Sequence, residues 1–197
     1  MQTVAIEGTL REAFGKKATK SLRKQGLVPC VAYSGETTFH FTTPSTAFKN
    51  LIYTPDFKVA EITLDGQTHR AILKDAQYHP VTDAVMHIDF LLLVDGRNLI
   101  TQVPVKTEGV APGVKLGGKL TQVTRRVKIK TTPENLVDHM LVDVSDLDLG
   151  RSVRVRDLKS VDGVEVMTSP GIPLASVEIP RALRSAQTAA AKEGEEA

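Results

Sequence analysis

The sequence has no tryptophan and a single cysteine, and aromatic residues make up only 5% of its 197 residues. One cysteine, Cys30, excludes an internal disulfide, as is usual for proteins of a reducing cytoplasm. The longest apolar run, Phe90 to Val94, is far too short to cross a bilayer. Residues 1–7 lack the apolar stretch of a secretory signal. We therefore expect a cytoplasmic protein with no membrane partner.

The net charge is also small, because 25 Lys and Arg residues against 23 Asp and Glu residues leave only +2. A protein that coats nucleic acid along its whole surface would be more basic, so any activity of that kind has to be local. The apolar fraction of 41% is sufficient for a real core. Cys30 lies in the apolar run 28–32, and we interpret it as a small core residue rather than a nucleophile.

Positive charge is concentrated in one short segment near the start of the chain. Between Arg11 and Lys24 there are six cations and one acid, Glu12. At 100° per residue, one side of a helix over 16–24 carries Lys16, Thr19, Lys20, Arg23 and Lys24, and the other side carries Ala18 and Leu22. Like charges four residues apart repel by a few tenths of a kcal/mol per pair. An anionic partner, of which a nucleic-acid backbone is the obvious example, would relieve this repulsion.

The sequence around this helix predicts short strands. Gly26 and Pro29 end the helix. A short helix at 45–53 is expected to pack through Phe48, Leu51 and Ile52, and Asp65-Gly66 predicts a tight hairpin turn. Alternating or apolar runs predict strands over 3–10, 28–33, 39–42, 58–64, 68–73 and 85–94.

The second half is also predicted to consist mainly of strands, with a loop at 109–118 and a helical turn at 145–149. The expected strands cover 100–108, 120–131, 142–144, 152–155, 164–167 and 175–179. Their spacing favours an antiparallel barrel or sandwich. We thus expect a mostly β protein with a few short helices, with domains at 1–94 and 95–180 and a flexible or frayed helical tail at 181–197.

Two polar residues on one predicted strand face, His87 and Asp89, are candidates for chemistry. A metal site would need further ligands, for which His69 and His79 are candidates without compact spacing. A hydrolase would need a nucleophile, and the sequence has no Gly-x-Ser-x-Gly elbow. A structural pair and a polar contact to a ligand such as RNA both stay open.

Two further segments have a plain structural interpretation. Residues 113–119 resemble a phosphate loop, but Leu120 stands where such a loop has Ser or Thr, so we interpret them as a turn. The cations of 125–130 alternate with apolar residues, as on a solvated strand or a protected sheet edge. A second RNA contact at 125–130 stays open.

Several motifs together resemble one family. They are Leu10-Arg11-Glu12, Gly15-Lys16, Leu22-Arg23-Lys24, Gly26-Leu27-Val28-Pro29 before Tyr33, His79-Pro80-Val81, His87-Ile88-Asp89-Phe90, Val103-Pro104-Val105, Glu108-Gly109, the run 111–118, and Asp157-Leu158-Lys159. In this order they resemble the bacterial large-subunit ribosomal proteins that bind 5S rRNA, number twenty-five of the L series. The likeness extends over residues 1–180 and is to the longer, two-domain Ctc (general stress protein) form.

The resemblance implies a six-stranded β-barrel-like N-terminal domain on the loop E region of 5S rRNA and a β-rich C-terminal domain. It implies no enzymatic activity, catalytic residue, metal or cofactor. The large ribosomal subunit would be the partner, with neighbouring ribosomal proteins contacted through the C-terminal domain. By position, the implied RNA-binding residues are Arg11, Lys16, Thr19, Lys20, Arg23, Tyr33, His87 and Asp89.

This sequence departs from the family pattern at four positions, namely Lys17, Lys20, Ser21 and Ser34. Lys20 stands where Arg is usual, and a Lys gives up the bidentate fork while keeping the charge. At this position the sequence therefore predicts phosphate neutralisation, which needs only the charge.

The sequence leaves three functions to distinguish. The first is a structural RNA-binding protein of the ribosome. The second is a stress-related interaction protein whose C-terminal domain binds another protein, with RNA as a secondary partner. The third is a small hydrolase or metalloprotein around His79, His87 and Asp89.

Overall fold

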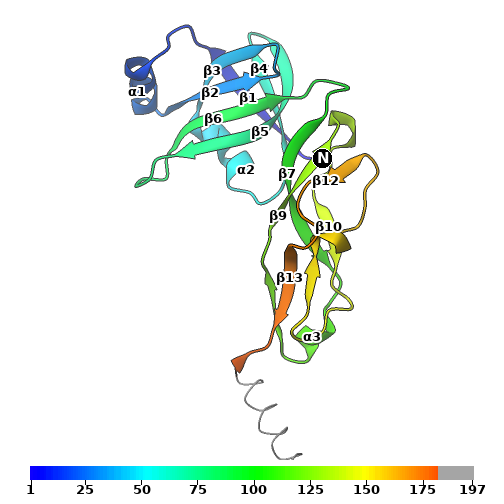
Figure 1. The fold of residues 1–197 in the computed structure, drawn as a ribbon. Helices are drawn as coiled ribbons and strands as arrows, with labels where there is room; N and C mark the ends of the chain where they lie inside the picture. Colours follow the sequence, from blue (N-terminus) through cyan, green and yellow to red (C-terminus); the bar gives the residue numbers. More distant parts are fainter. Residues whose placement is uncertain (182–197) are drawn as a thin grey trace, which may run out of the picture. The chain divides into compact units, whose positions relative to one another are not determined.

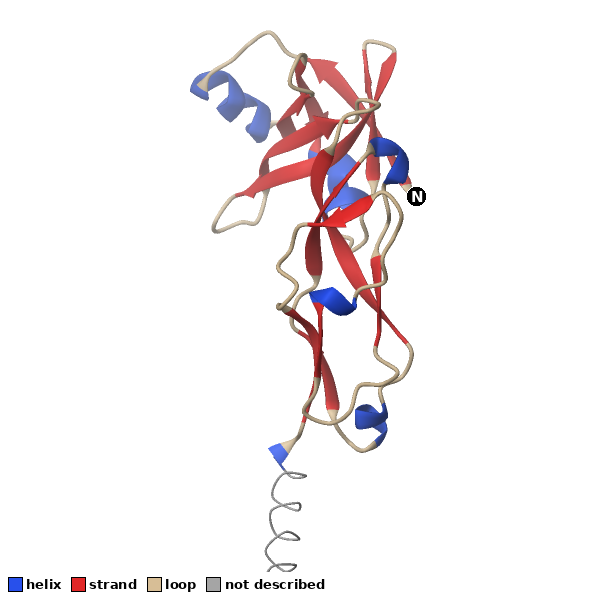
Figure 2. Ribbon diagram, turned by 45° about the vertical axis from the view of Figure 1, so that its right-hand side comes forward, coloured by secondary structure: helices blue, strands red, loops and turns tan. Residues whose placement is uncertain are grey.

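The computed structural model describes residues 1–181 and divides them into two compact units. The first unit contains residues 1–101 and 131–138, and the second contains 102–130 and the residues from 139 onward. Strands predominate in both units, and the helices are short (Figure 2). The mostly β fold class predicted from the sequence is confirmed.

A closed six-stranded barrel forms the main part of the first unit (Figure 1). Around the barrel the strands follow the order β1-β3-β2-β6-β5-β4, and β4 closes it by pairing in parallel with β1. The strands are β1 (Thr3–Leu10), β2 (Leu27–Tyr33), β3 (Thr38–Pro44), β4 (Val59–Leu64), β5 (Gln67–Tyr78) and β6 (Val85–Leu92). Closure leaves the barrel with no free sheet edge, so every strand is paired on both sides.

The inward-facing side chains fill the barrel and set the direction of the others. Cys30, Ile88 and Phe90 are fully buried, and the ring centroids of Phe41 and Phe90 lie 6.1 Å apart. Because side chains alternate along a strand, burial of Ile88 and Phe90 turns the neighbouring His87 and Asp89 outward. The interpretation of Cys30 as a core residue is confirmed.

Three helical segments lie within residues 1–101 of the first unit. Helix α1 (Lys16–Lys24) lies on the outside of the barrel next to β2 (Figure 1). It ends where the chain turns at Gly26, whose φ of 77° favours glycine. The segments η1 (Ser45–Phe48) and α2 (Lys49–Ile52) form the predicted short helix, with Phe48 fully buried.

The second unit contains two small sheets, ordered β10-β7-β9-β12 and β11-β13-β8. Their strands are β7 (Leu99–Glu108), β8 (Lys119–Gln122), β9 (Arg126–Thr131), β10 (Met140–Asp143), β11 (Ser152–Arg154), β12 (Val164–Val166) and β13 (Pro173–Glu178). The helical turns of this half of the chain are α3 (Pro112–Lys115), η2 (Pro133–Asn135) and η3 (Val155–Asp157).

Three details of this half differ from the sequence expectation. The run 120–131 is two strands in different sheets, because the amides of Val123 and Thr124 both donate to the carbonyl of Leu174 and turn the chain. The helical turn lies at α3, within the predicted loop, whereas 145–149 forms turns. The pairing is not purely antiparallel, since β10 runs parallel to β7. Apart from Arg181, the predicted tail at 181–197 lies outside the described residues.

Candidate nucleic-acid interface

Helix α1 presents its cations to solvent. Lys16, Lys20, Arg23 and Lys24 are exposed, whereas Ala18 and Leu22 are half-buried against the barrel. This is the division of sides that the helical periodicity predicts. The first turn of α1 contains no acid, so no carboxylate of that turn offsets the charge of Lys16 and Lys20.

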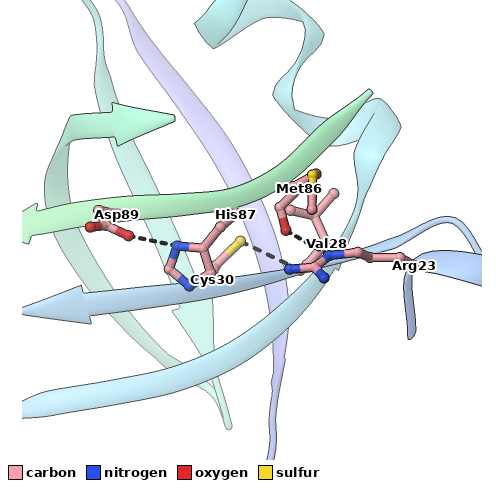
Figure 3. Close-up of polar contacts among 6 residues, drawn as sticks. All are labelled: Arg23, Val28, Cys30, Met86, His87 and Asp89. Atoms are coloured by element: carbon pink, nitrogen blue, oxygen red, sulfur yellow. Dashed lines mark hydrogen bonds and ion pairs between the residues drawn. The ribbon is translucent and has the colours of Figure 1, made fainter. Parts of the chain in front are cut away.

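Arg23 ties the end of α1 to strand β6. Its Nε donates a hydrogen bond of 3.1 Å to the carbonyl oxygen of Met86 (Figure 3). A lysine could not make this bond while also presenting a planar fork, because only guanidinium has separate Nε and Nη donors. The bond fixes the guanidinium beside His87, the next residue of β6.

Thr19 is less exposed than its place in the sequence suggests. It is half-buried, and its hydroxyl lies 3.1 Å from the carbonyl oxygen of Gly15 and 3.2 Å from that of Lys16. The hydroxyl proton is therefore used within the helix, and the side chain can offer only its oxygen lone pairs to a partner.

His87 and Asp89 form a pair on the outer face of β6 (Figure 3). His87 Nδ1 lies 2.7 Å from Asp89 Oδ1, and the side chains are 22% and 33% exposed. At this distance Nδ1–H donates to the carboxylate, so Nε2 of a neutral imidazole is left as an acceptor. The second carboxylate oxygen is a further acceptor. The pair can thus take hydrogen bonds from hydroxyl or amino groups of a ligand.

Tyr33 lies on the neighbouring strand, where Val31 of β2 pairs with Asp89 of β6. Its burial, and after that the carboxylates of Asp89 and Asp75, raise the pKa of the Tyr33 phenol. The phenol therefore keeps its proton at neutral pH and can donate a hydrogen bond.

Arg11 is set apart from the cations of α1. It is half-buried, its guanidinium carbon lies 5.5 Å from the centre of the Phe14 ring, and its Nε and Nη1 have no solvent contact and no hydrogen-bond partner within the described chain. Phe14 in turn meets His40 edge-on, with centroids 5.0 Å apart. Arg11 thus lies beneath an exposed aromatic ring, whereas the cations of α1 point into solvent.

Strand β5 adds polar residues that the sequence did not single out. It continues to Tyr78, beyond the predicted end at 73, and its register places Asp75 opposite Asp89 and Gln77 opposite His87. The polar face therefore extends from β6 onto β5. The alternation of Asp75, Ala76 and Gln77 after Leu73 is the signal that would have extended the strand.

The histidines considered as metal ligands lie in different settings. His69 stacks on Phe39 with ring centroids 4.9 Å apart, and His79 Nδ1 accepts from the amides of Val81 and Thr82 at 3.3 Å each. Across residues 1–181, no three His, Cys, Asp or Glu side chains are grouped so that they could hold a metal ion.

No helix in the described part of the chain has the length and apolar character needed to span a membrane.

Comparison with known proteins accounts for both halves of the chain. Residues 6–90 match the model of the Ribosomal L25p family, and residues 98–181 match that of the Ribosomal protein TL5, C-terminal domain. The proteins named large ribosomal subunit protein bL25 from Phocaeicola vulgatus and Cytophaga hutchinsonii are both 39% identical over 98% of this chain and 100% of their own length. The bL25 protein of Christiangramia forsetii is 44% identical over 83% of this chain and 76% of its own. The chain therefore belongs to the Ribosomal L25p family, in the long form that also carries the TL5-type C-terminal domain.

Proposed function

We propose that this chain binds 5S rRNA, at its loop E region, through the outer surface formed by α1 and strands β2 and β6. Family membership makes it a structural ribosomal protein of the large subunit rather than an enzyme. What the family does not specify is how this chain's own residues hold the RNA. The side chains of the first unit support a specific arrangement. The protein would act on ribosomes in the cytoplasm.

One observation carries the proposal, namely the hydrogen bond from Arg23 to Met86. It joins the cationic helix to the strand that bears His87 and Asp89, so that charge and polar recognition groups are held at a fixed spacing. Cations that neutralise phosphates provide affinity and register without sequence information. Discrimination has to come from polar groups that reach bases and riboses.

The shape of RNA suits this arrangement. An A-form helix has a wide, shallow minor groove that displays 2′-hydroxyls and base edges. The pair of His87 and Asp89 offers acceptors for those hydroxyls and for base amino groups, and the protonated phenol of Tyr33 offers a donor. Lys16, Lys20 and Arg23 would follow the adjacent phosphates. Thr19 would take part through its lone pairs.

Arg11 has a different proposed role. Its two buried nitrogens lack partners in the free protein, which costs free energy unless an acceptor arrives. In the complex, an acceptor group of the RNA would bind these two nitrogens of Arg11. It would gain access when the exposed ring of Phe14 moves aside.

The test is a competition between 5S rRNA and a transfer RNA of similar length for the full chain. We expect labelled 5S rRNA to be displaced by unlabelled 5S rRNA at much lower concentration than by transfer RNA. Equal displacement by both would show charge-driven binding without recognition and would contradict the proposal.

A protein partner for the second unit is a further candidate. Val110 and Leu116, which flank α3, are 64% and 62% exposed, and exposed apolar residues of this kind occur where proteins meet. We propose a neighbouring ribosomal protein as the partner. A Leu116→Asp variant should bind 5S rRNA normally but sediment less completely with large subunits. Equal co-sedimentation would exclude this contact.

A further inference from the structure

A pocket lies beside the proposed RNA surface and takes no part in the contacts proposed above. It has a volume of about 350 Å³ and lies between the end of α1, the η1–α2 segment and the turn at 79–84. Its apolar lining includes Leu27, Val28, Val85 and Met86. The size is at the lower end of the range for small-molecule sites. A flat, mostly apolar group of a few rings would fit such a space.

The rim of the pocket is positively charged. Arg23 and Lys49 are both exposed and both line it, and none of its described lining residues is acidic. Arg23 also belongs to the cationic face of α1, so the pocket opens next to the proposed path of the RNA backbone. A ligand that combines an apolar ring with flanking negative charge is favoured by this arrangement.

An exposed aromatic ring lies at the mouth. Tyr53 follows the last residue of α2, and 67% of its surface is accessible. Leaving a ring of this size in water forgoes apolar burial, unless a partner covers it. Nucleobases stack on such rings irrespective of their sequence.

The polar groups of the pocket include hydrogen-bond donors as well as acceptors. His79 accepts hydrogen bonds at Nδ1 from the amides of Val81 and Thr82, so the proton of its neutral ring is on Nε2. That nitrogen is a donor. The hydroxyl groups of Ser45 and Thr82 can either donate or accept. Together they suit the mixed donors and acceptors of a base edge.

We propose that this pocket receives one unstacked nucleobase of the bound RNA, stacked on Tyr53, with its flanking phosphates on Arg23 and Lys49. The proposal rests on the RNA-binding function proposed above and extends it by a site for a single nucleotide. Sequence-specific RNA recognition commonly uses bases that have left the helical stack. Stacking on Tyr53 would add affinity that does not depend on salt, separate from the salt-dependent contacts of Arg23 and Lys49.

The test uses the full chain, labelled 5S rRNA and three variants. Tyr53→Ala removes the stacking ring, Tyr53→Phe retains it, and Thr46→Trp fills the mouth from η1. We expect Tyr53→Ala and Thr46→Trp to weaken binding about 5- to 100-fold with an unchanged salt slope. Tyr53→Phe should bind like the wild type. Circular dichroism and thermal unfolding verify that each variant is folded.

The outcomes separate this proposal from the one beneath it. If Tyr53→Ala and Thr46→Trp bind as the wild type does, while removal of the α1 cations weakens binding, the pocket proposal is wrong and the RNA-binding function stands. If the wild type does not prefer 5S rRNA, the pocket proposal is tested by itself. The four nucleoside monophosphates are then titrated into the full chain, and its amide signals are followed by NMR. Saturable shifts of the amide signals of Gly26, Thr82 and Met86 would support it. Shifts with an acidic peptide but not with nucleotides would overturn it.

Discussion

Nδ1 of His87 lies 2.7 Å from a carboxylate oxygen of Asp89, two residues further along the same strand. The pair is partly accessible on the outer face of the barrel, and Asp75 of the neighbouring strand lies opposite Asp89. Two carboxylates side by side repel phosphate, so this patch is unsuited to simple charge attraction. Within it, the His87–Asp89 pair is suited to hydroxyl and amino donors, and so to distinguishing one RNA surface from another.

Replacing Asp89 by Asn should therefore reduce discrimination more than affinity. The amide loses one acceptor and no longer orients His87 through a charge-assisted bond. We expect the preference for intact 5S rRNA over a loop-mutated version to fall by about 1–3 kcal/mol. The measurement is the ratio of dissociation constants for the two RNAs.

Asp75→Asn is the matched control for Asp89→Asn. It removes the same charge from the adjacent strand without touching His87. We expect it to change both affinities alike. If Asp89→Asn also weakens both RNAs equally, Asp89 does not take part in recognition.

Two variants of Arg23 distinguish the contribution of its charge to RNA binding from that of its hydrogen-bond geometry. Arg23→Ala should weaken 5S rRNA binding by about 1–3 kcal/mol and lower the salt slope by somewhat under one unit. Arg23→Lys keeps the charge but cannot bond the Met86 carbonyl through one nitrogen while presenting a planar fork through two others, so we expect weaker binding with nearly the wild-type slope. Titrations at several salt concentrations measure both quantities. Equal affinity of the Lys variant and the wild type would show that the Met86 bond is immaterial.

A close approach inside the barrel makes Gly8 sensitive to substitution. A Cβ at this position would lie 2.5 Å from Cδ2 of Phe41 and 2.8 Å from Cδ2 of Leu64. The side chains of Phe41 and Leu64 are both buried and cannot easily move aside. Gly8→Ala should therefore lower the free energy of unfolding, measured by urea denaturation, by about 1–3 kcal/mol. Gly171→Ala, where a Cβ has no neighbour within 4 Å, should change it by less than about 0.5 kcal/mol. Similar values for the two variants would contradict the packing of β1.

The buried thiol predicts a dependence of stability on alkaline pH. Burial raises the pKa of Cys30 above its usual 9.0, and the opposing effect of Arg11 does not offset this. The unfolded chain loses the thiol proton first, so the stabilising contribution of the neutral thiol is complete below pH 9 and is lost as pH rises further. Between pH 9 and 10 the free energy of unfolding should fall by up to about 1.4 kcal/mol.

Cys30→Ala is the control for the alkaline effect and should have a shallower pH dependence. In addition, a thiol reagent should modify the wild type only as fast as it unfolds, because the thiol has no surface access. The same pH dependence in both proteins would assign the alkaline loss to other groups.

The features that the sequence predicted well depend on neighbours along the chain. Helix α1 and its two sides follow from the spacing of Ala18 and Leu22, and the turn at Asp65-Gly66 has positive φ at both residues, as its type requires. Local periodicity is sufficient for such elements because their partners are a few residues away.

The features that it did not predict depend on distant pairings. The placement of Arg11 under Phe14 depends on His40 of β3, and the parallel pairing of β10 with β7 joins segments more than thirty residues apart. Nothing in a local pattern specifies these contacts. Asp75 escaped prediction for a different reason, because β5 continues to Tyr78, beyond the predicted end at residue 73.

The central claim is tested most directly by the salt dependence of 5S rRNA binding when Lys16, Lys20 and Arg23 are all changed to Ala. The matched control changes Lys115, Lys119 and Arg151, three exposed cations of the second unit, to Ala. If α1 lies along the phosphates, the first variant should lower the salt slope by about two units, and the control should leave it unchanged. A wild-type slope in the α1 variant would contradict the account.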